Sequence, residues 1–150
     1  MDVEITRDGL KLQGKVERAA GDKTAALIIF HGFGGDLGYE EGNLYELISQ
    51  KARACGVTAV RFDFSGCGKS QGRFEDMDVL REILDAIAIL QYVRRLPYIT
   101  DIYLLGHSQG GVIAGMLAGL YPDIVKKLIL LAPAATLKTD AQKGACMGTF

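Results

Sequence analysis

Residues 101–111, DIYLLGHSQGG, constrain the fold of this chain more than any other stretch. Residues 102–105 are a short apolar run of strand-forming residues, and residues 112–121 have the pattern of a helix. Between these two segments lies the sequence Gly-x-Ser-x-Gly. A strand, this pattern and a helix in immediate succession predict a nucleophile elbow, the sharp turn that presents a reactive serine.

The two glycines of this pattern explain how a serine can occupy such a turn. Gly106 and Gly110 lack the side chains that would collide there. We therefore expect the Ser108 hydroxyl to be exposed at the carboxyl edge of a sheet, with the backbone N–H of Gln109 pointing at the group that Ser108 attacks. His107 is expected to project away from Ser108 and to pack beside the turn. A glycine-rich turn with an incidental serine is the alternative.

Apolar runs and helical patterns alternate along the rest of the chain. Asp8-Gly9 lies between two loosely alternating segments, residues 3–6 and 11–17, which predicts an antiparallel hairpin. Residues 77–95 have the pattern of a long amphipathic helix. Further strands are predicted in three apolar runs, residues 25–30, 57–62 and 127–132. This alternation predicts one α/β domain with a mostly parallel sheet, helices on both faces and an N-terminal antiparallel hairpin.

Two helices carry more specific expectations. Asn43 is expected to cap a helix that ends before Gly56 and has one face marked by Leu44, Leu47, Ile48, Lys51 and Ala52. In the helix after the elbow, Gly111, Gly115 and Gly119 recur at four-residue spacing. Their missing side chains are expected to let that helix lie close to the sheet.

Three predicted strands end in glycine-rich loops, at His31, Asp63 and Gly106. Ligands of such sheets bind beyond the carboxyl ends of the strands, so we expect the site among these loops. The backbone N–H of Phe33 is the natural second donor to an oxyanion, because Gly32 and the glycines that follow let the backbone approach a substrate closely. His31 is expected to order this loop through hydrogen bonds.

A serine nucleophile needs a general base, and the sequence offers no suitable one. The two histidines are His31 and His107, and neither suits the role. In this architecture the acid and then the histidine follow the serine, yet only Asp123 and Asp140 follow Ser108, and no histidine does. The apolar strand at 127–132 would also lie near a sheet edge. We therefore expect residues 1–150 to be the N-terminal part of a single longer domain, truncated before its last strands.

Composition and spacing exclude several other classes. The net charge of −1 provides no basic excess for nucleic acid or an anionic membrane, and the start of the chain lacks the pattern of a signal peptide. Because the three cysteines form no C-x-x-C pair, neither a disulfide framework nor a zinc site is predicted. A cytoplasmic protein is expected.

Two phosphate-binding motifs also fail on spacing. Gly68, Lys69 and Ser70 match the end of a P-loop, but Asp63 stands where that motif requires glycine. The stretch HGFGGDLG lacks the G-x-G-x-x-G spacing, since Leu37 occupies the position of the third glycine. No nucleotide, metal or other cofactor is therefore expected.

Three segments together resemble the α/β-hydrolase superfamily, and most closely the cinnamoyl (feruloyl) esterases. They are residues 31–35 (HGFGG), 61–70 (RFDFSGCGKS) and 106–111 (GHSQGG). The resemblance implies Ser108 as the nucleophile, Phe33 and Gln109 as oxyanion donors, and esters of hydroxycinnamic acids such as ferulate as substrates.

The expected function is that of a serine carboxylic-ester hydrolase that forms an acyl-enzyme on Ser108. Its expected partner is a small ester, with no nucleic acid and no membrane. A general carboxylesterase, thioesterase or acyl-peptide hydrolase of the same fold is the first alternative. The second is a half-domain without catalysis that pairs its exposed edge with another chain, for example in a homodimer.

Overall fold

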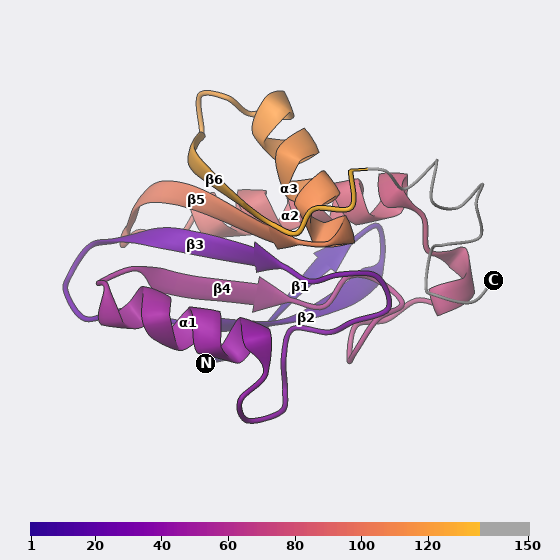
Figure 1. Ribbon diagram of the computed structural model, residues 1–150, viewed down its shortest axis with the longest axis horizontal. Helices are drawn as coiled ribbons and strands as arrows, with labels where there is room; N and C mark the ends of the chain where they lie inside the picture. Colours follow the sequence, from indigo (N-terminus) through magenta and orange to yellow (C-terminus); the bar gives the residue numbers. More distant parts are fainter. Residues whose placement is uncertain (136–150) are drawn as a thin grey trace.

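The computed structural model describes residues 1–135 as a six-stranded sheet with three α-helices and one short 3-10 helix (Figure 1). In chain order the elements are β1 (Asp2–Arg7), β2 (Leu10–Glu17), β3 (Thr24–Phe30), α1 (Leu44–Ala54), β4 (Thr58–Phe62), η1 (Phe74–Asp76), α2 (Val79–Arg94), β5 (Ile99–His107), α3 (Gln109–Leu120) and β6 (Val125–Leu131). Within these residues, no helix combines the length and apolar character needed to cross a membrane.

The strand order is β1-β2-β4-β3-β5-β6. β1 pairs antiparallel with β2 and β2 antiparallel with β4, whereas β4, β3, β5 and β6 are parallel. The two-residue turn between β1 and β2 has positive φ at Asp8 and Gly9, the conformation that matches the twist of a hairpin. The predicted fold class is therefore confirmed. Because β4, β3 and β5 are neighbours, the three glycine-rich loops that follow them meet at one end of the sheet.

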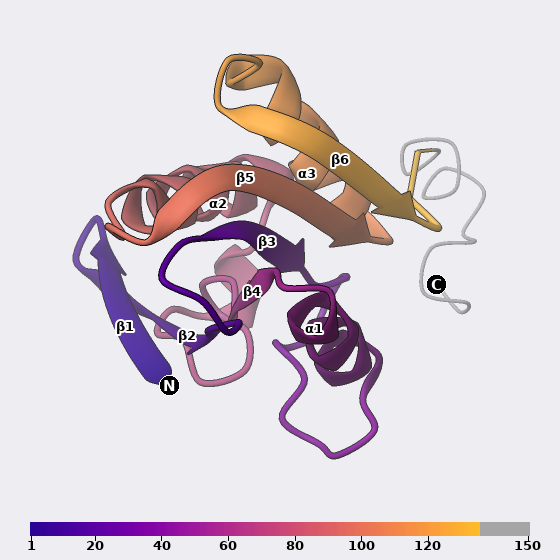
Figure 2. The ribbon, with the colours of Figure 1, turned by 90° about the vertical axis from the view of Figure 1, so that its left-hand side faces the viewer.

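Helices cover both faces of the sheet, as Figure 2 shows. On one side α1 packs over a small cluster that contains Leu27, Ile29 and Leu105. On the other side α2 and α3 pack over the larger core, whose buried members include Ile28, Phe30, Ile89, Leu90, Leu104, Ile113 and Leu117. The central strands are buried by both layers, which explains their continuous apolar sequences.

The predicted face of α1 is confirmed only in part: Ile48 and Ala52 pack against the cluster beneath the helix, but the face is rotated from the predicted one. Leu44 and Leu47 are 42% and 50% exposed, whereas Tyr45 and Ser49 are buried. The polar groups of the two buried residues have hydrogen-bond partners inside the molecule, Ser49 with Glu17 and Tyr45 with the loops at the end of the sheet. These bonds offset the cost of burying polar atoms and set the rotation of the helix. The predicted cap is confirmed, because the Asn43 side chain accepts a hydrogen bond from the N–H of Tyr45.

The glycines of α3 do not all face the sheet. A Cβ on Gly111 would approach Pro133 to 2.9 Å, but a Cβ on Gly115 or Gly119 would meet nothing within 4 Å. The expectation that these two glycines bring the helix close to the sheet is therefore wrong. The helix packs instead through its buried apolar residues Ile113, Ala114 and Leu117.

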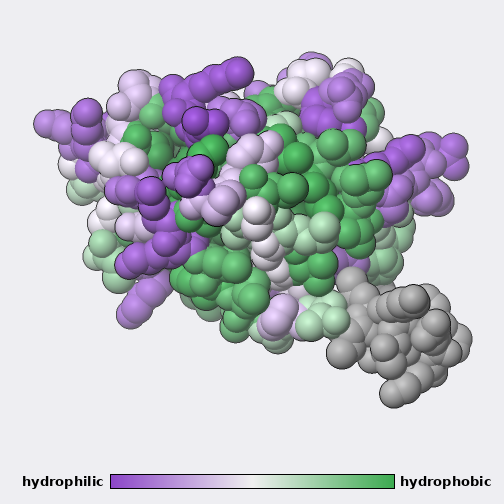
Figure 3. All heavy atoms as spheres, turned by 90° about the horizontal axis from the view of Figure 1, so that it is seen from above, coloured by the Kyte–Doolittle hydropathy of each residue, from purple (hydrophilic) through white to green (hydrophobic). Residues whose placement is uncertain are grey.

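Within the described residues, β6 forms one edge of the sheet although its sequence is that of a buried strand. Its residues 128–131 are 37% to 48% exposed, and Met116 and Leu120 of α3 are exposed nearby. Figure 3 shows hydrophobic side chains gathered on the side of the molecule that carries α3 and β6.

Candidate active site

Ser108 occupies the turn between the end of β5 and the start of α3. Its φ of 54° and ψ of −122° are unusual for a residue with a side chain, and such strain costs on the order of 1–3 kcal/mol. A Cβ on Gly106 would lie 2.1 Å from the carbonyl oxygen of Gly110, and a Cβ on Gly110 would lie 2.3 Å from that of Phe30. Both glycines of the motif are therefore required by the close approach of the backbone.

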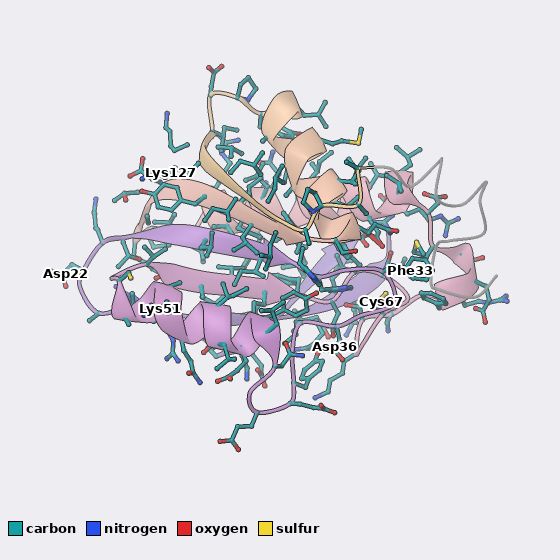
Figure 4. The ribbon with its side chains drawn as sticks, viewed as in Figure 1. Asp22, Phe33, Asp36, Lys51, Cys67 and Lys127 are labelled. Carbon is teal, nitrogen blue, oxygen red and sulfur yellow. The ribbon has the colours of Figure 1, made fainter. Side chains whose placement is uncertain are left out.

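The loop after β3 lies directly against this turn. A Cβ on Gly32 would lie 3.3 Å from the Cβ of Ser108. Among residues 1–135, the backbone N–H of Phe33 has no hydrogen-bond partner. Gln109 is the first residue of α3, where backbone N–H groups have no acceptor within the helix. The structure thus brings two N–H donors, those of Phe33 and Gln109, to the loops beside Ser108. Figure 4 shows Phe33 at the end of the sheet where β3 and β4 terminate.

His31 supports this loop rather than facing the serine. It is 1% exposed, and its Nε2 accepts a hydrogen bond from the N–H of Phe64 at 3.1 Å. Its Nδ1 therefore carries the hydrogen and donates it to the carbonyl of Gly32 at 2.8 Å. Burial lowers the pKa of His31, which keeps the ring neutral. Because both nitrogens are engaged, His31 cannot accept the proton of Ser108.

The other candidates for the base or the acid are His107, Asp123 and Asp140, and the structure describes the first two. The Nδ1 of His107 lies 2.8 Å from the hydroxyl of Tyr45 on α1. Asp123 precedes β6, which runs parallel to β5, so it lies at the opposite end of the sheet from Ser108. Asp140 lies outside the described residues. Neither His31 nor Asp123 is therefore placed to take the proton of Ser108.

Asp63, which the sequence indicated only as the start of a tight loop, joins two loops of the site. It is fully buried, and its carboxylate accepts hydrogen bonds from the N–H of Leu37 at 2.7 Å, the N–H of Lys69 at 2.8 Å and the hydroxyl of Tyr39. Burial and the bond to Asp63 raise the pKa of Tyr39. These bonds hold the segment after the Phe33 loop against the loop that follows β4. A lone aspartate after a buried strand was the only sequence signal for this role.

Glu82 on α2 is a second residue that the sequence did not reveal. It is 2% exposed, and its carboxyl accepts a hydrogen bond at 3.0 Å from the side-chain amide of Gln109. Burial raises its pKa to about 7, the hydrogen bond from Gln109 opposes this shift, and the charges of Asp85 and Asp78 add to it. Glu82 therefore anchors the side chain of Gln109, the residue that directly follows Ser108. An acidic residue within a helix normally faces solvent, so its spacing gave no signal.

The burial of Glu82 predicts a pH-dependent stability. Its folded-state pKa of about 7 lies above the ordinary 4.5, so the folded chain holds this proton more tightly than the unfolded chain. The resulting stabilisation is complete below pH 4.5 and is lost as pH rises through about 7. The expected loss is on the order of 2–3 kcal/mol in the free energy of unfolding.

Glu82→Gln should remove this loss, because glutamine does not titrate and its amide oxygen can still accept the bond from Gln109. Urea denaturation on the acid and alkaline sides of this range measures the effect. Glu75→Gln on η1 is the matched control, since the Glu75 side chain is 72% exposed. An equal fall in stability with pH for wild type and Glu82→Gln would contradict the prediction.

The described residues form neither a metal site nor a reactive thiol. Within residues 1–135, no three His, Cys, Asp or Glu side chains converge as a metal site would require. Cys67 is buried, and burial raises the pKa of its thiol to about 11. The thiol is therefore protonated at neutral pH and is a poor nucleophile.

Comparison with known proteins agrees with this geometry. A family model described as the alpha/beta hydrolase fold matches residues 25–146. The structure of Est1E from Butyrivibrio proteoclasticus with ferulic acid bound has a TM-score of 0.88 and 35% identity, over 95% of this chain and 57% of that chain.

Two curated relatives also match. The proline iminopeptidase of Lactobacillus delbrueckii subsp. bulgaricus is 30% identical over 129 residues, which cover 84% of this chain and 42% of the relative. The human (lyso)-N-acylphosphatidylethanolamine lipase is 33% identical over 107 residues, 71% of this chain and 30% of the relative. The chain thus spans about half the length or less of these proteins. The matched family model, the sheet order and the turn at Ser108 show that the chain belongs to the α/β-hydrolase fold family.

Proposed function

We propose that this protein is a serine ester hydrolase and that Ser108 is its nucleophile. The observation that carries the proposal is the strained backbone of Ser108, at φ 54°, beside the first N–H of α3 and the N–H of Phe33, which has no hydrogen-bond partner within residues 1–135. Strain of this kind persists where the surrounding structure imposes it and is concentrated at functional sites. The hydrolase family of the chain supports the same chemistry.

In the proposed reaction, the Ser108 oxygen bonds to the carbonyl carbon of the ester while its proton passes to a general base. The carbonyl oxygen becomes an oxyanion that accepts hydrogen bonds from Phe33 and Gln109. When the oxyanion collapses, the bond to the alcohol oxygen breaks and the alcohol leaves with the proton from the base. Water then attacks the acyl-enzyme in the same way, releasing the carboxylic acid and restoring Ser108.

The proposal assigns the proton-accepting histidine, and the acid that orients it, to a segment outside residues 1–150. His31 has both ring nitrogens engaged, and the Nδ1 of His107 faces Tyr45. The residues described here supply the nucleophile and the two oxyanion donors. Activity therefore belongs to a protein that contains both parts.

The proposed substrates are esters of hydroxycinnamic acids such as ferulic acid. Est1E, with ferulic acid in its structure, supports this choice. In this chain the rings of Phe33 and Phe74 pair at 5.4 Å, edge to face, and Phe74 is 42% exposed. An exposed aromatic ring next to the oxyanion loop offers a packing surface for an aromatic acyl group.

Methyl ferulate and methyl butyrate test this substrate class, because they share the same leaving alcohol. The expected result is a kcat/KM for methyl ferulate at least about 10-fold higher than for methyl butyrate. Faster turnover of methyl butyrate, of a thioester or of an N-acylated peptide would favour a general carboxylesterase, a thioesterase or an acyl-peptide hydrolase, respectively. The iminopeptidase and lipase relatives support those alternatives.

A second candidate function follows from β6, whose apolar residues 128–131 remain exposed at a sheet edge. An open edge of this kind pairs readily with another strand, so the chain would serve as an assembly module, for example as a homodimer. Light scattering of the purified protein measures this. A dimer without hydrolytic activity would favour the second candidate, and a monomer that hydrolyses esters would exclude it.

The proposed setting is the cytoplasm, with a small ester as the only ligand. Cys55 and Cys67 are free thiols, which suits a reducing compartment. The net charge of −1 provides no attraction to nucleic acid or to an anionic membrane.

A further inference from the structure

Tyr45 is a buried tyrosine whose hydroxyl reaches the candidate active site from outside it. It is the second residue of α1, and the cap Asn43 fixes its backbone by accepting a hydrogen bond from its N–H at 2.8 Å. Its side chain is in the small core cluster beneath α1, and the residue is 8% exposed. The aromatic ring alone would satisfy this packing, so the position of the hydroxyl is a separate feature.

The hydroxyl of Tyr45 connects two loops that are far apart in the sequence. It accepts a hydrogen bond from the N–H of Gly32 at 3.0 Å. It also lies 2.8 Å from the Nδ1 of His107. Since Gly32 supplies the proton of the first bond, the single proton of the hydroxyl is free to be donated to His107. When the hydroxyl donates this proton, His107 is the tautomer with an unprotonated Nδ1 and a hydrogen on Nε2.

The two residues that Tyr45 connects each directly precede a residue of the proposed site. Gly32 precedes Phe33, the donor in the loop after β3, and His107 precedes Ser108, whose neighbour Gln109 is the other donor. The two loops are in close contact at Gly32 and Ser108, so a side chain at position 32 would have little room. The two hydrogen bonds of the Tyr45 hydroxyl, to the N–H of Gly32 and to the imidazole of His107, therefore link the two loops that carry the donors.

We propose that Tyr45 is a positioning residue, whose hydroxyl sets the spacing between the oxyanion donors Phe33 and Gln109 by bonding to Gly32 and His107. This inference rests on the proposed function, because it concerns how the oxyanion is held. Donors of this kind act only when they are aimed at the place where charge develops. Displacement of a donor by about 1 Å is enough to lower a rate by ~10²-fold.

Tyr45→Phe tests the proposal, since it removes the hydroxyl and keeps the ring that packs in the core. The expected result is a kcat lowered by ~10–100-fold with KM little changed, because the lost contact acts on the transition state. Tyr103→Phe is the matched control. Tyr103 packs against the same cluster, and among residues 1–135 its hydroxyl makes no bond to either loop. It should hydrolyse the ester at the wild-type rate.

Substitutions of His107 distinguish positioning from packing. Asparagine can present its side-chain oxygen near the position of Nδ1, so His107→Asn should retain most of the activity. His107→Leu removes the acceptor and should lower kcat as Tyr45→Phe does. The double variant Tyr45→Phe, His107→Leu should lose little more than either single variant, because both act through one bridge.

Two further measurements test the hydrogen bonds of Tyr45 without depending on enzyme activity. Nitrogen NMR should show an unprotonated Nδ1 in His107 of the wild type, and hydrogen exchange at Gly32 should be faster in Tyr45→Phe. If wild type hydrolyses esters while Tyr45→Phe keeps its kcat, the inference is wrong and the proposed function stands. If wild type neither hydrolyses esters nor reacts with a serine-directed probe, the proposed function fails and the positioning role fails with it.

Discussion

Replacing Ser108 with alanine is expected to lower kcat for ester hydrolysis by about 10⁴–10⁶-fold, because it removes the atom that forms the acyl-enzyme. The residual rate would come from substrate binding and from the N–H groups of Phe33 and Gln109. The fold should be unaffected, since the Ser108 side chain makes no capping hydrogen bond to α3. Initial rates with methyl ferulate, together with urea denaturation, measure both quantities.

Ser49→Ala is the control for this substitution. Ser49 is a buried serine on α1, and its hydroxyl donates a hydrogen bond to Glu17 at 3.0 Å. This variant should lose some stability and keep its kcat, which is the opposite pattern to that of Ser108→Ala. Turnover by Ser108→Ala at the wild-type rate would show that Ser108 is not the nucleophile.

Gly110→Ala is expected to destabilise the fold by about 3–5 kcal/mol. Its new Cβ would lie 2.3 Å from the carbonyl oxygen of Phe30 and 2.4 Å from that of His31. These are backbone atoms at the end of a central strand, so the clash can be relieved only if α3 moves away from the sheet. The free energy of unfolding from urea denaturation measures the loss, and failure to fold is its extreme form.

Gly119→Ala is the matched control on the same helix, because its Cβ would meet nothing within 4 Å. Alanine forms helices better than glycine, so this variant should be more stable than wild type by up to about 1 kcal/mol. If Gly110→Ala unfolded at the same urea concentration as wild type, the close packing of the elbow against β3 would be wrong.

The fold was predictable because its signals are local. Continuous apolar runs predicted β3, β4 and β6, and Asp8-Gly9 predicted the hairpin of β1 and β2. The turn at Ser108 was predictable because Gly106 and Gly110 fit only where the backbone approaches too closely for a side chain. In each case the conformation is determined by a few residues that are adjacent in the sequence.

The rest depends on contacts between residues far apart in the sequence. Tyr45 and Glu82 reach the site through hydrogen bonds to partners 62 and 27 residues away, and no local pattern marks such bonds. The predicted face of α1 was right at Ile48 and Ala52. It missed Tyr45 and Ser49, whose burial depends on hydrogen bonds to distant residues, and it wrongly included the exposed Leu44 and Leu47. The prediction for Gly115 and Gly119 was wrong because spacing alone does not show which side of a helix meets the sheet.

Reaction of the purified native protein with a fluorophosphonate tests the central claim most directly, because such probes label only activated serines. Intact-mass spectrometry before and after treatment counts the adducts, and peptide mapping locates them. Ser108→Ala, treated in parallel, shows whether labelling depends on this hydroxyl. A single adduct on Ser108 that is absent from the variant is the predicted result. No adduct, or an adduct that persists in Ser108→Ala, would contradict the proposal that Ser108 is the nucleophile.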